Sequence, residues 1–398
     1  MAIILWAMIW AGIYSDPSYI FNKKFFYTFF DIFQGLRALL PILAGFYALM
    51  VIVRSRNKKA SADMGPNYYF VLYGLVGATF FLASPNPVVS LYWAFLYLSV
   101  LIVIWLLHIH QDSLENLRKC LNLNMWVCII MTLFFFLGPI RPMLSGAPRY
   151  RLFDLPFGLG SQTANGVARF VAIAALIAVS RLRLKPIRLK ILWAIIFGFA
   201  FIVLLYSQSR SALLGFGLAA LVLILISRKY LWLLFGTPVL FYYLYMSWFV
   251  WRARGNLVTA LFLSGREGLW DLALKTSLKS PLFGFGFHAD RFMLEGEHVH
   301  MAYLHSLIQS GLLGAIFFLV GIFGICSLII RSKIWRRISK VEVRDSSFLL
   351  ECIAIIVFLL ARSFFESTAA FYGVDLLVFI PAVGFLYQWL KIHPESSP

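Results

Sequence analysis

The chain has 398 residues, of which 61% are hydrophobic, 17% aromatic and 13% charged, and its mean hydropathy is +0.84. Soluble globular proteins are about 45–50% apolar and about 25% charged, so the composition excludes a soluble domain and predicts an integral membrane protein. The 35 Lys and Arg residues outnumber the 17 Asp and Glu residues, giving a formal charge of +18. Nucleic-acid binding, basic cytoplasmic loops and a polyanionic substrate each produce such an excess, and the positions of the charges distinguish them.

Apolar runs predict an all-helical, polytopic fold of about twelve transmembrane helices, since a span needs roughly 20 apolar residues. In chain order, the runs cover residues 2–20, 34–53, 67–84, 88–108, 124–140, 165–180, 191–206, 211–227, 230–250, 302–330, 347–362 and 370–390. Little sequence is left over for a soluble domain. Residues 1–398 are therefore expected to form a single transmembrane domain, with one large loop at 251–301.

Basic residues cluster in every second loop between these runs. They are Arg54, Arg56, Lys58, Lys59, Arg118, Lys119, Arg181, Arg183, Lys185, Arg188, Lys190, Arg228, Lys229, Arg331, Lys333, Arg336, Arg337, Lys340, Arg344 and Lys391. The positive-inside rule makes these loops cytoplasmic, and about twelve spans then put both termini inside. Topology explains this charge, and no nucleic-acid partner is expected.

The intervening loops, expected on the outer face, are basic as well. They contain Arg141, Arg149, Arg151, Arg210, Arg252, Arg254, Arg266, Lys275, Lys279 and Arg291. The positive-inside rule does not account for basic residues on this face. Because one guanidinium group can bind two phosphate oxygens at once, an anionic substrate such as a phosphate or diphosphate is favoured. The alternative is that single arginines extend toward lipid phosphates at the membrane surface.

Two polar segments of the outer loops contain prominent arginines. Ser207–Ala212 interrupts two apolar runs and places Arg210 at the membrane boundary, where a helix-end arginine is the simpler alternative to a ligand. Arg266 opens a second segment, whose apolar residues recur at helical spacing. This spacing predicts a short amphipathic helix along the membrane surface, ending at Ser280–Pro281, with Asp271 and Lys275 paired at i,i+4.

A third segment, Glu297–Leu304, leads into the apolar run that begins at residue 302. His300 is expected at or just before the N-terminus of that helix. The helix dipole disfavours the imidazolium there, so the neutral ring, which accepts a proton, is favoured. A structural histidine is the alternative interpretation, and His298 is a neighbouring candidate.

Acidic and histidine residues between 288 and 305 raise the question of a metal site. They are His288, Asp290, Glu295, Glu297, His298, His300 and His305. No HExxH or other fixed helical pair occurs among them, and His305 is expected to point into a membrane helix, away from the others. No metal and no other cofactor are therefore predicted.

The three segments together resemble the bacterial O-antigen ligase and O-antigen polymerase superfamily. Ser207–Ala212 is similar to the family's polar turn with its arginine, and Gly265–Gly286 is similar to the second arginine motif. The third motif runs from His300 through Tyr303 to Gly314. Met301 and Gln309 depart from the usual pattern, which has Asn and an acid at these positions. Gly158–Asn165 and Glu366 are weaker similarities.

The resemblance implies a type C glycosyltransferase-like fold in the bacterial inner membrane, with its active site facing the periplasm. It implies transfer of a glycan from undecaprenyl diphosphate by an inverting, metal-independent reaction. His300 would be the general base, and Arg210 and Arg266 would bind the diphosphate. Further substrate-binding residues are predicted to be Arg141, Arg149, Arg151, Asn165, Arg169 and Tyr303.

The acceptor separates the possible functions. A ligase delivers the polysaccharide to a lipid A core, whereas a polymerase joins undecaprenyl-linked repeat units. The extra basic residues of the outer face favour the ligase, and the short interval from Arg266 to His300 keeps the polymerase as the alternative. A protein O-glycosyltransferase ranks third. A lipid-linked oligosaccharide transporter is less favoured, because the polar segments gather at one membrane face and not at the midplane.

Overall fold

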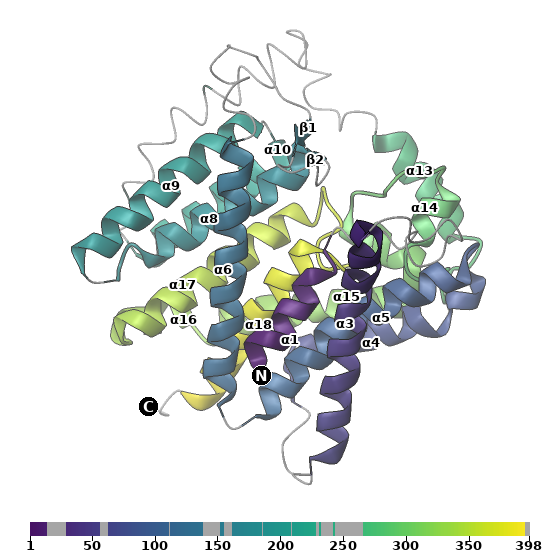
Figure 1. Ribbon diagram of the computed structural model, residues 1–398, viewed down its shortest axis with the longest axis horizontal. Coiled ribbons are helices and arrows are strands. Elements are labelled where there is room, and N and C mark those ends of the chain that lie inside the picture. Colours follow the sequence, from purple (N-terminus) through teal and green to yellow (C-terminus); the bar gives the residue numbers. More distant parts are fainter. Residues whose placement is uncertain are drawn as a thin grey trace. The chain divides into compact units, whose positions relative to one another are not determined.

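The computed structural model shows a predominantly helical chain (Figure 1). It describes residues 1–13, 29–55, 63–110, 112–137, 152–154, 161–184, 186–207, 209–227, 231, 242 and 266–394, and for residues 29–34, 152–154, 161 and 162 it describes only the backbone. Eleven of the twelve predicted apolar runs overlap a helix here, while run 230–250 lies almost wholly outside the described residues.

Among the described residues, seven helices are long and apolar enough to cross a membrane, so the chain is a multi-pass membrane protein. These candidate spans are Gly35–Arg54, Pro87–Ile109, Ser113–Leu137, Ala164–Arg181, Ile187–Ser207, Ala302–Arg331 and Val374–Ile392. Two shorter apolar helices are α1 (Ala2–Ala11) and α10 (Arg210–Ile226). The total of about twelve spans and the type C architecture stay predictions.

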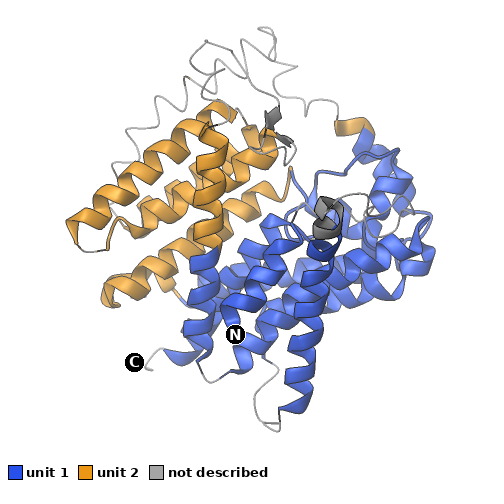
Figure 2. Cartoon of the chain, viewed as in Figure 1, with its two compact units in different colours: residues 1–123, 269–332, 366–398 blue, residues 124–268, 333–365 orange. Residues whose placement is uncertain are grey.

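The helices form two compact units (Figure 2). Unit 1 comprises Met1–Leu123, Leu269–Ser332 and Glu366–Pro398, and unit 2 comprises Asn124–Gly268 and Lys333–Phe365. Helices α6 (Ser113–Leu137) and α13 (Arg266–Ser277) each begin in one unit and continue into the other. That residues 1–398 act as a single transmembrane domain stays a prediction.

Unit 1 is built from α1, α3 (Phe29–Arg54), α4 (Asn67–Thr79), η1 (Phe81–Ala83), α5 (Pro87–Ile109), α14 (Ala289–Met293), α15 (Ala302–Arg331) and α18 (Val374–Ile392). Helix α15 packs on α4, and α3 packs on α5. Small residues allow this approach, as at Gly45, where an added Cβ would lie 2.3 Å from Ser99 Oγ. The buried rings of Phe70, Tyr73 and Phe318 meet edge to face between the α4 and α15 helices.

Helix α15 is broken at Gly311, whose φ and ψ are 59° and −166°. The apolar run 302–330 predicts one continuous helix, but the structure divides it into an N-terminal segment and a longer C-terminal one. Hydrophobic periodicity does not register such a break, because glycine interrupts the backbone without interrupting the apolar composition.

Unit 2 contains α8 (Ala164–Arg181), α9 (Ile187–Ser207), α10, α16 (Ile334–Arg337), η5 (Ile338–Lys340) and α17 (Val343–Arg362). Strands β1 (Leu152–Asp154) and β2 (Ser161–Thr163) pair antiparallel, with Leu152 opposite Thr163. This three-residue ladder pairs backbone N–H and C=O groups of a loop that no helix takes up, and the predicted all-α fold class is consistent with the described residues. Thr163 then caps α8 by accepting from the Gly166 N–H.

An ion pair is buried inside unit 2 between α8 and α17. Arg181 Nε lies 2.8 Å from Glu351 Oε2, with side-chain exposures of 8% and 1%. The guanidinium also lies over the rings of Trp193 and Phe348, at 5.5 and 4.9 Å from their centroids. Each charge depends on the other, because an isolated ion in this environment is costly.

Glu351→Ala is expected to destabilise the protein by about 3–5 kcal/mol, because it leaves the Arg181 guanidinium buried without its acidic partner. Thermal denaturation in detergent, followed by loss of the monodisperse chromatographic peak, measures the effect. Glu115→Ala is the matched control, since Glu115 is 43% exposed in its pair with Arg118 and such pairs are worth at most about 1 kcal/mol. Equal midpoints for both variants would contradict the assignment.

Candidate active site

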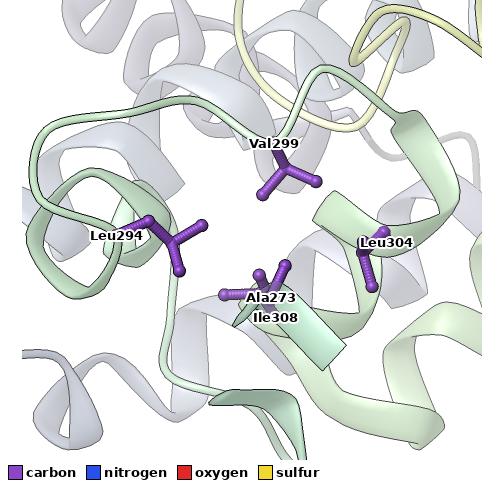
Figure 3. Close-up of a cluster of buried hydrophobic side chains, with 5 residues drawn as sticks. All are labelled: Ala273, Leu294, Val299, Leu304 and Ile308. Carbon is purple, nitrogen blue, oxygen red and sulfur yellow. The ribbon is translucent and has the colours of Figure 1, made fainter. Parts of the chain in front are cut away.

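Helix α13 is the amphipathic helix that the sequence predicts, and it ends at Ser277, shortly before the expected stop. Its buried Ala273 meets Leu294, Val299, Leu304 and Ile308 in one apolar cluster (Figure 3). On its exposed side, Lys275 and Asp271 form the predicted ion pair. The cluster fixes the chain on both sides of His300, since it includes Val299 and Leu304.

His300 lies two residues before the first residue of α15 and has a left-handed backbone, with φ of 50°. A side chain in this region costs about 1–2 kcal/mol relative to the right-handed one. The preceding residue, Val299, holds the turn in place, because it is fully buried and its carbonyl accepts from Trp270 Nε1 at 3.1 Å. Strain that the surroundings maintain at one histidine is typical of a functional residue.

The imidazole of His300 contacts Glu366, with 3.1 Å between Nδ1 and Oε2. The carboxylate is only an acceptor, so His300 donates its Nδ1–H to Glu366 and keeps the Nε2 lone pair to accept a proton. Glu366 is 11% exposed and His300 33% exposed. The sequence gives Glu366 only a weak similarity, because the two residues are 66 positions apart and nothing local pairs them.

Arg266 is the first residue of α13 and is half-buried. Its Nη1 donates to the Phe365 carbonyl at 2.6 Å, which uses one of the five N–H donors of the guanidinium. Phe365 precedes Glu366 in the chain, so a single peptide bond joins the acceptor of Arg266 to the partner of His300.

Arg210 is the first residue of α10 and is half-buried. Ser209, the N-cap residue, donates its hydroxyl to Asn165 Oδ1 at 2.8 Å. The Asn165 carbonyl accepts from Arg362 Nη2 at 3.5 Å, and Arg362 is 2% exposed. The structure thus brings Asn165 to the N-terminus of α10, where the helix dipole and the arginines favour an anion. Sequence reasoning missed Arg362, since its run reads as an ordinary apolar helix.

The other predicted substrate-binding residues are placed as follows. Arg169 lies one turn after Asn165 on α8, is half-buried, and has its guanidinium 5.8 Å from the Phe170 ring centroid. Tyr303 is half-buried in the first turn of α15, with its ring 6.3 Å from that of Phe318. Arg141, Arg149 and Arg151 lie outside the described residues.

The candidate residues divide between the two units. His300, Glu366 and Tyr303 belong to unit 1, and Arg210, Arg266, Asn165 and Arg169 belong to unit 2. Within the units, the structure brings together His300 with Glu366, and Ser209 with Asn165 and Arg362. A common action of Arg210, Arg266 and His300 on one substrate stays a prediction.

The prediction that His305 points away from the other ligand-type residues is wrong. The centroid of its ring lies 4.7 Å from that of the His298 ring, and its Nε2 lies 3.5 Å from Asp290 Oδ1. Helix α14 packs on α15 and brings Asp290 to the first turn of that helix. Burial lowers the pKa of His298 to about 4, although Asp290 opposes this shift. Burial alone would raise the pKa of Asp290, but His305 and His298 hold it well below its usual range.

The segment Pro281–Gly286 pairs its backbone with the break in α15. Phe285 N–H donates to the Ile308 carbonyl at 2.9 Å, and Leu312 N–H donates to the Pro281 carbonyl at 2.7 Å. A Cβ on Gly284 would lie 2.5 Å from Gly311 N, and one on Gly311 would lie 2.3 Å from the Leu282 carbonyl carbon. Glycine is required at both positions, since each also has a positive φ. The second and third sequence motifs are therefore in direct contact.

The described part of the chain has apolar helices, a histidine that is paired with a carboxylate, and half-buried arginines at two helix N-termini, which are features expected of a membrane enzyme. Residues 195–319 match a family model described as O-antigen ligase. The match confirms the resemblance that the sequence motifs indicate and includes Arg210, Arg266 and His300. It supports a membrane glycosyltransferase of the O-antigen ligase or polymerase kind. No curated protein matches the chain.

Gly284→Ala is expected to lower the stability by at least about 2 kcal/mol, because the new methyl group overlaps the backbone at Gly311 in addition to the cost of its positive φ. Gly217→Ala is the matched control, since an added Cβ there meets no atom within 4 Å and alanine is favoured in a helix. Thermal midpoints of the two purified variants test this. A Gly284→Ala midpoint equal to that of Gly217→Ala would show that the close approach does not exist.

Proposed function

We propose that this protein is an O-antigen ligase of the bacterial inner membrane, with its active site facing the periplasm. It would transfer polysaccharide from undecaprenyl diphosphate to a sugar hydroxyl of a lipid A core. The observation that carries the proposal is the His300–Glu366 pair, since it supplies an oriented proton acceptor at the end of the stretch that matches the ligase family.

In the proposed reaction, His300 Nε2 removes the proton of the acceptor hydroxyl as that oxygen attacks the anomeric carbon. The new carbon–oxygen bond forms while the bond to the diphosphate breaks on the opposite face, which inverts the anomeric centre. Undecaprenyl diphosphate leaves with the electron pair. This chemistry corresponds to the metal-independent, type C mechanism that the resemblance implies.

Arg210 and Arg266 would bind the diphosphate as it leaves. Negative charge grows on the bridging oxygen in the transition state, and one well-placed donor there is worth roughly 3–4 kcal/mol. Arginine suits this task, because its planar fork donates to two phosphate oxygens together. The hydrogen bond from Arg266 to the Phe365 carbonyl holds its guanidinium in a defined position, as a diphosphate ligand requires.

A second basic group would contact phosphates of the acceptor or donor. It comprises Arg141, Arg149, Arg151 and Arg169, with Asn165 and Tyr303 as further substrate contacts. A phosphorylated lipid A core explains this surplus of outer arginines better than a second undecaprenyl-linked unit does. A polymerase is the alternative, since the donor and the three central residues would be the same.

Purified protein is expected to transfer an undecaprenyl-diphosphate glycan to lipid A core, in a brief assay with EDTA present. His300→Ala should lose about a hundred- to ten-thousand-fold in rate, which is the usual contribution of a general base. Gel mobility of the lipid A product measures transfer. His110→Gln, an exposed histidine elsewhere in unit 1, is the control and should retain full activity.

The acceptor products separate the alternatives. Longer undecaprenyl-linked chains without core product would identify a polymerase, and an active, normally inserted His300→Ala protein would rule out the base assignment. A transporter would transfer nothing to either acceptor, and single cysteines at positions 210 and 300 would then react with reagents from both sides of the membrane.

Glu366→Gln is expected to lower kcat at least about 10-fold, which is part of the contribution of a general base. The Gln amide can either donate to His300 Nδ1 or accept from it, so it no longer fixes one tautomer of the imidazole. KM should change little, since Glu366 acts through His300 and does not hold substrate. Glu366→Asp should restore part of kcat, and the exposed Glu297→Gln should leave both constants unchanged. A parallel loss of stability with unaltered kcat would assign Glu366 a purely structural role.

A further inference from the structure

Three side chains of metal-ligand type converge in unit 1 beside the His300 turn. Asp290 belongs to α14, His298 to the loop that follows, and His305 to the first turns of α15. One ligand atom of each lies within 4.8 Å of the others. The three residues come from three separate pieces of chain, so their convergence is a product of tertiary packing.

The cluster is enclosed. The side chains of Asp290 and His305 are each 1% exposed, and that of His298 is 10% exposed. The ring of Phe371 packs against both imidazoles, with centroids 5.2 and 5.5 Å away. Water has little access, so the polar atoms must be satisfied by one another or by a bound species.

Hydrogen bonding within the cluster is incomplete. Asp290 Oδ2 lies 2.7 Å from His298 Nδ1, but Asp290 Oδ1 and His305 Nδ1 are buried with no hydrogen-bond partner. The 3.5 Å between Asp290 Oδ1 and His305 Nε2 is too long for a well-formed bond. A carboxylate oxygen that is buried without a hydrogen-bond partner is costly.

Gln309 offers a fourth potential ligand atom, its amide oxygen. The Tyr73 hydroxyl has one proton and lies 2.6 Å from the Ala370 carbonyl and 2.7 Å from the Gln309 amide. The Ala370 carbonyl and Gln309 Oε1 are both acceptors, so we assign the Gln309 amide the opposite orientation, in which Tyr73 donates to Ala370 and the Gln309 NH₂ group donates to Tyr73. The amide oxygen of Gln309 then faces His305 Nε2, with which the amide group is in contact.

We propose that Asp290, His298 and His305 bind one divalent transition-metal ion of the zinc type, with the Gln309 oxygen as the fourth ligand. Two imidazoles and a carboxylate favour zinc over Mg²⁺ or Ca²⁺, which prefer oxygen ligands. Tetrahedral bonds of about 2.0–2.2 Å place ligand atoms about 3.4 Å apart, and the 3.5 Å between Asp290 Oδ1 and His305 Nε2 matches this separation. His298 Nδ1, which is 2.7 Å from the other Asp290 oxygen, and the Gln309 amide, which contacts His305 Nε2, would each move to admit the ion.

The ion is structural in this proposal. It ties α14, the following loop and α15 together, and it thereby fixes the chain two residues before His300. The reacting atoms of the proposed transfer do not touch it, and a closed, buried site keeps its ion during a brief exposure to EDTA. The site therefore exists whether or not the chain is a glycosyltransferase.

Metal analysis of the full-length protein, purified in detergent without added metal or chelator, tests the proposal. About one zinc ion per chain is expected by mass spectrometry of the metal content. After prolonged chelation the apoprotein should have a lower thermal midpoint, and added ZnCl₂ should restore it. Substitution with CoCl₂ should give the visible absorption of four- or five-coordinate Co²⁺, a readout that requires no variant.

Matched variants separate this site from adventitious binding. Asp290→Asn and His298→Gln should weaken the apparent zinc affinity by more than about 100-fold, beyond the 10- to 100-fold typical of residues that only support a ligand. Glu297→Gln and His110→Gln remove an exposed acid and an exposed histidine and should leave the affinity unchanged. Wild-type protein that retains no zinc, gives no Co²⁺ spectrum and is not stabilised by ZnCl₂ would overturn the proposal.

Discussion

The site in unit 1 depends on the backbone pairing between Pro281–Gly286 and the break of α15 at Gly311. These hydrogen bonds hold the returning chain against a membrane helix at a distance that only glycine permits. The apolar cluster around Ala273 and Val299 then fixes the turn at His300. The left-handed backbone conformation of His300 is tolerated because the packing of its buried neighbours on both sides maintains it.

Positive charge has two separate uses in this chain. In the basic loops it is expected to set the orientation of the helices, a role that requires no defined position for each residue. At the N-termini of α10 and α13, Arg210 and Arg266 each occupy a defined position, with Arg266 donating to the Phe365 carbonyl. A defined position at a helix N-terminus favours an anionic group, which agrees with a diphosphate-linked donor.

Buried charged and polar side chains require interaction partners, and three places in the structure illustrate this requirement. Arg181 and Glu351 neutralise each other inside unit 2, and the imidazole of His300 is oriented by Glu366. At the fully buried Asp290, one carboxylate oxygen contacts His298, whereas the other has no hydrogen-bond partner. That contrast distinguishes a complete ion pair from a cluster suited to a cation.

The sequence by itself determined the helical membrane class, most helix positions, the amphipathic α13 and the three motifs that match the ligase family, because hydrophobic periodicity and short motifs are local properties. Tertiary structure alone decided the pairing of His300 with Glu366, the contact of Arg362 with Asn165, the break at Gly311 and the convergence of His305 with Asp290. These features join residues that are distant in the chain or depend on a single backbone conformation. Packing selects such partners, and no local pattern in the sequence encodes them.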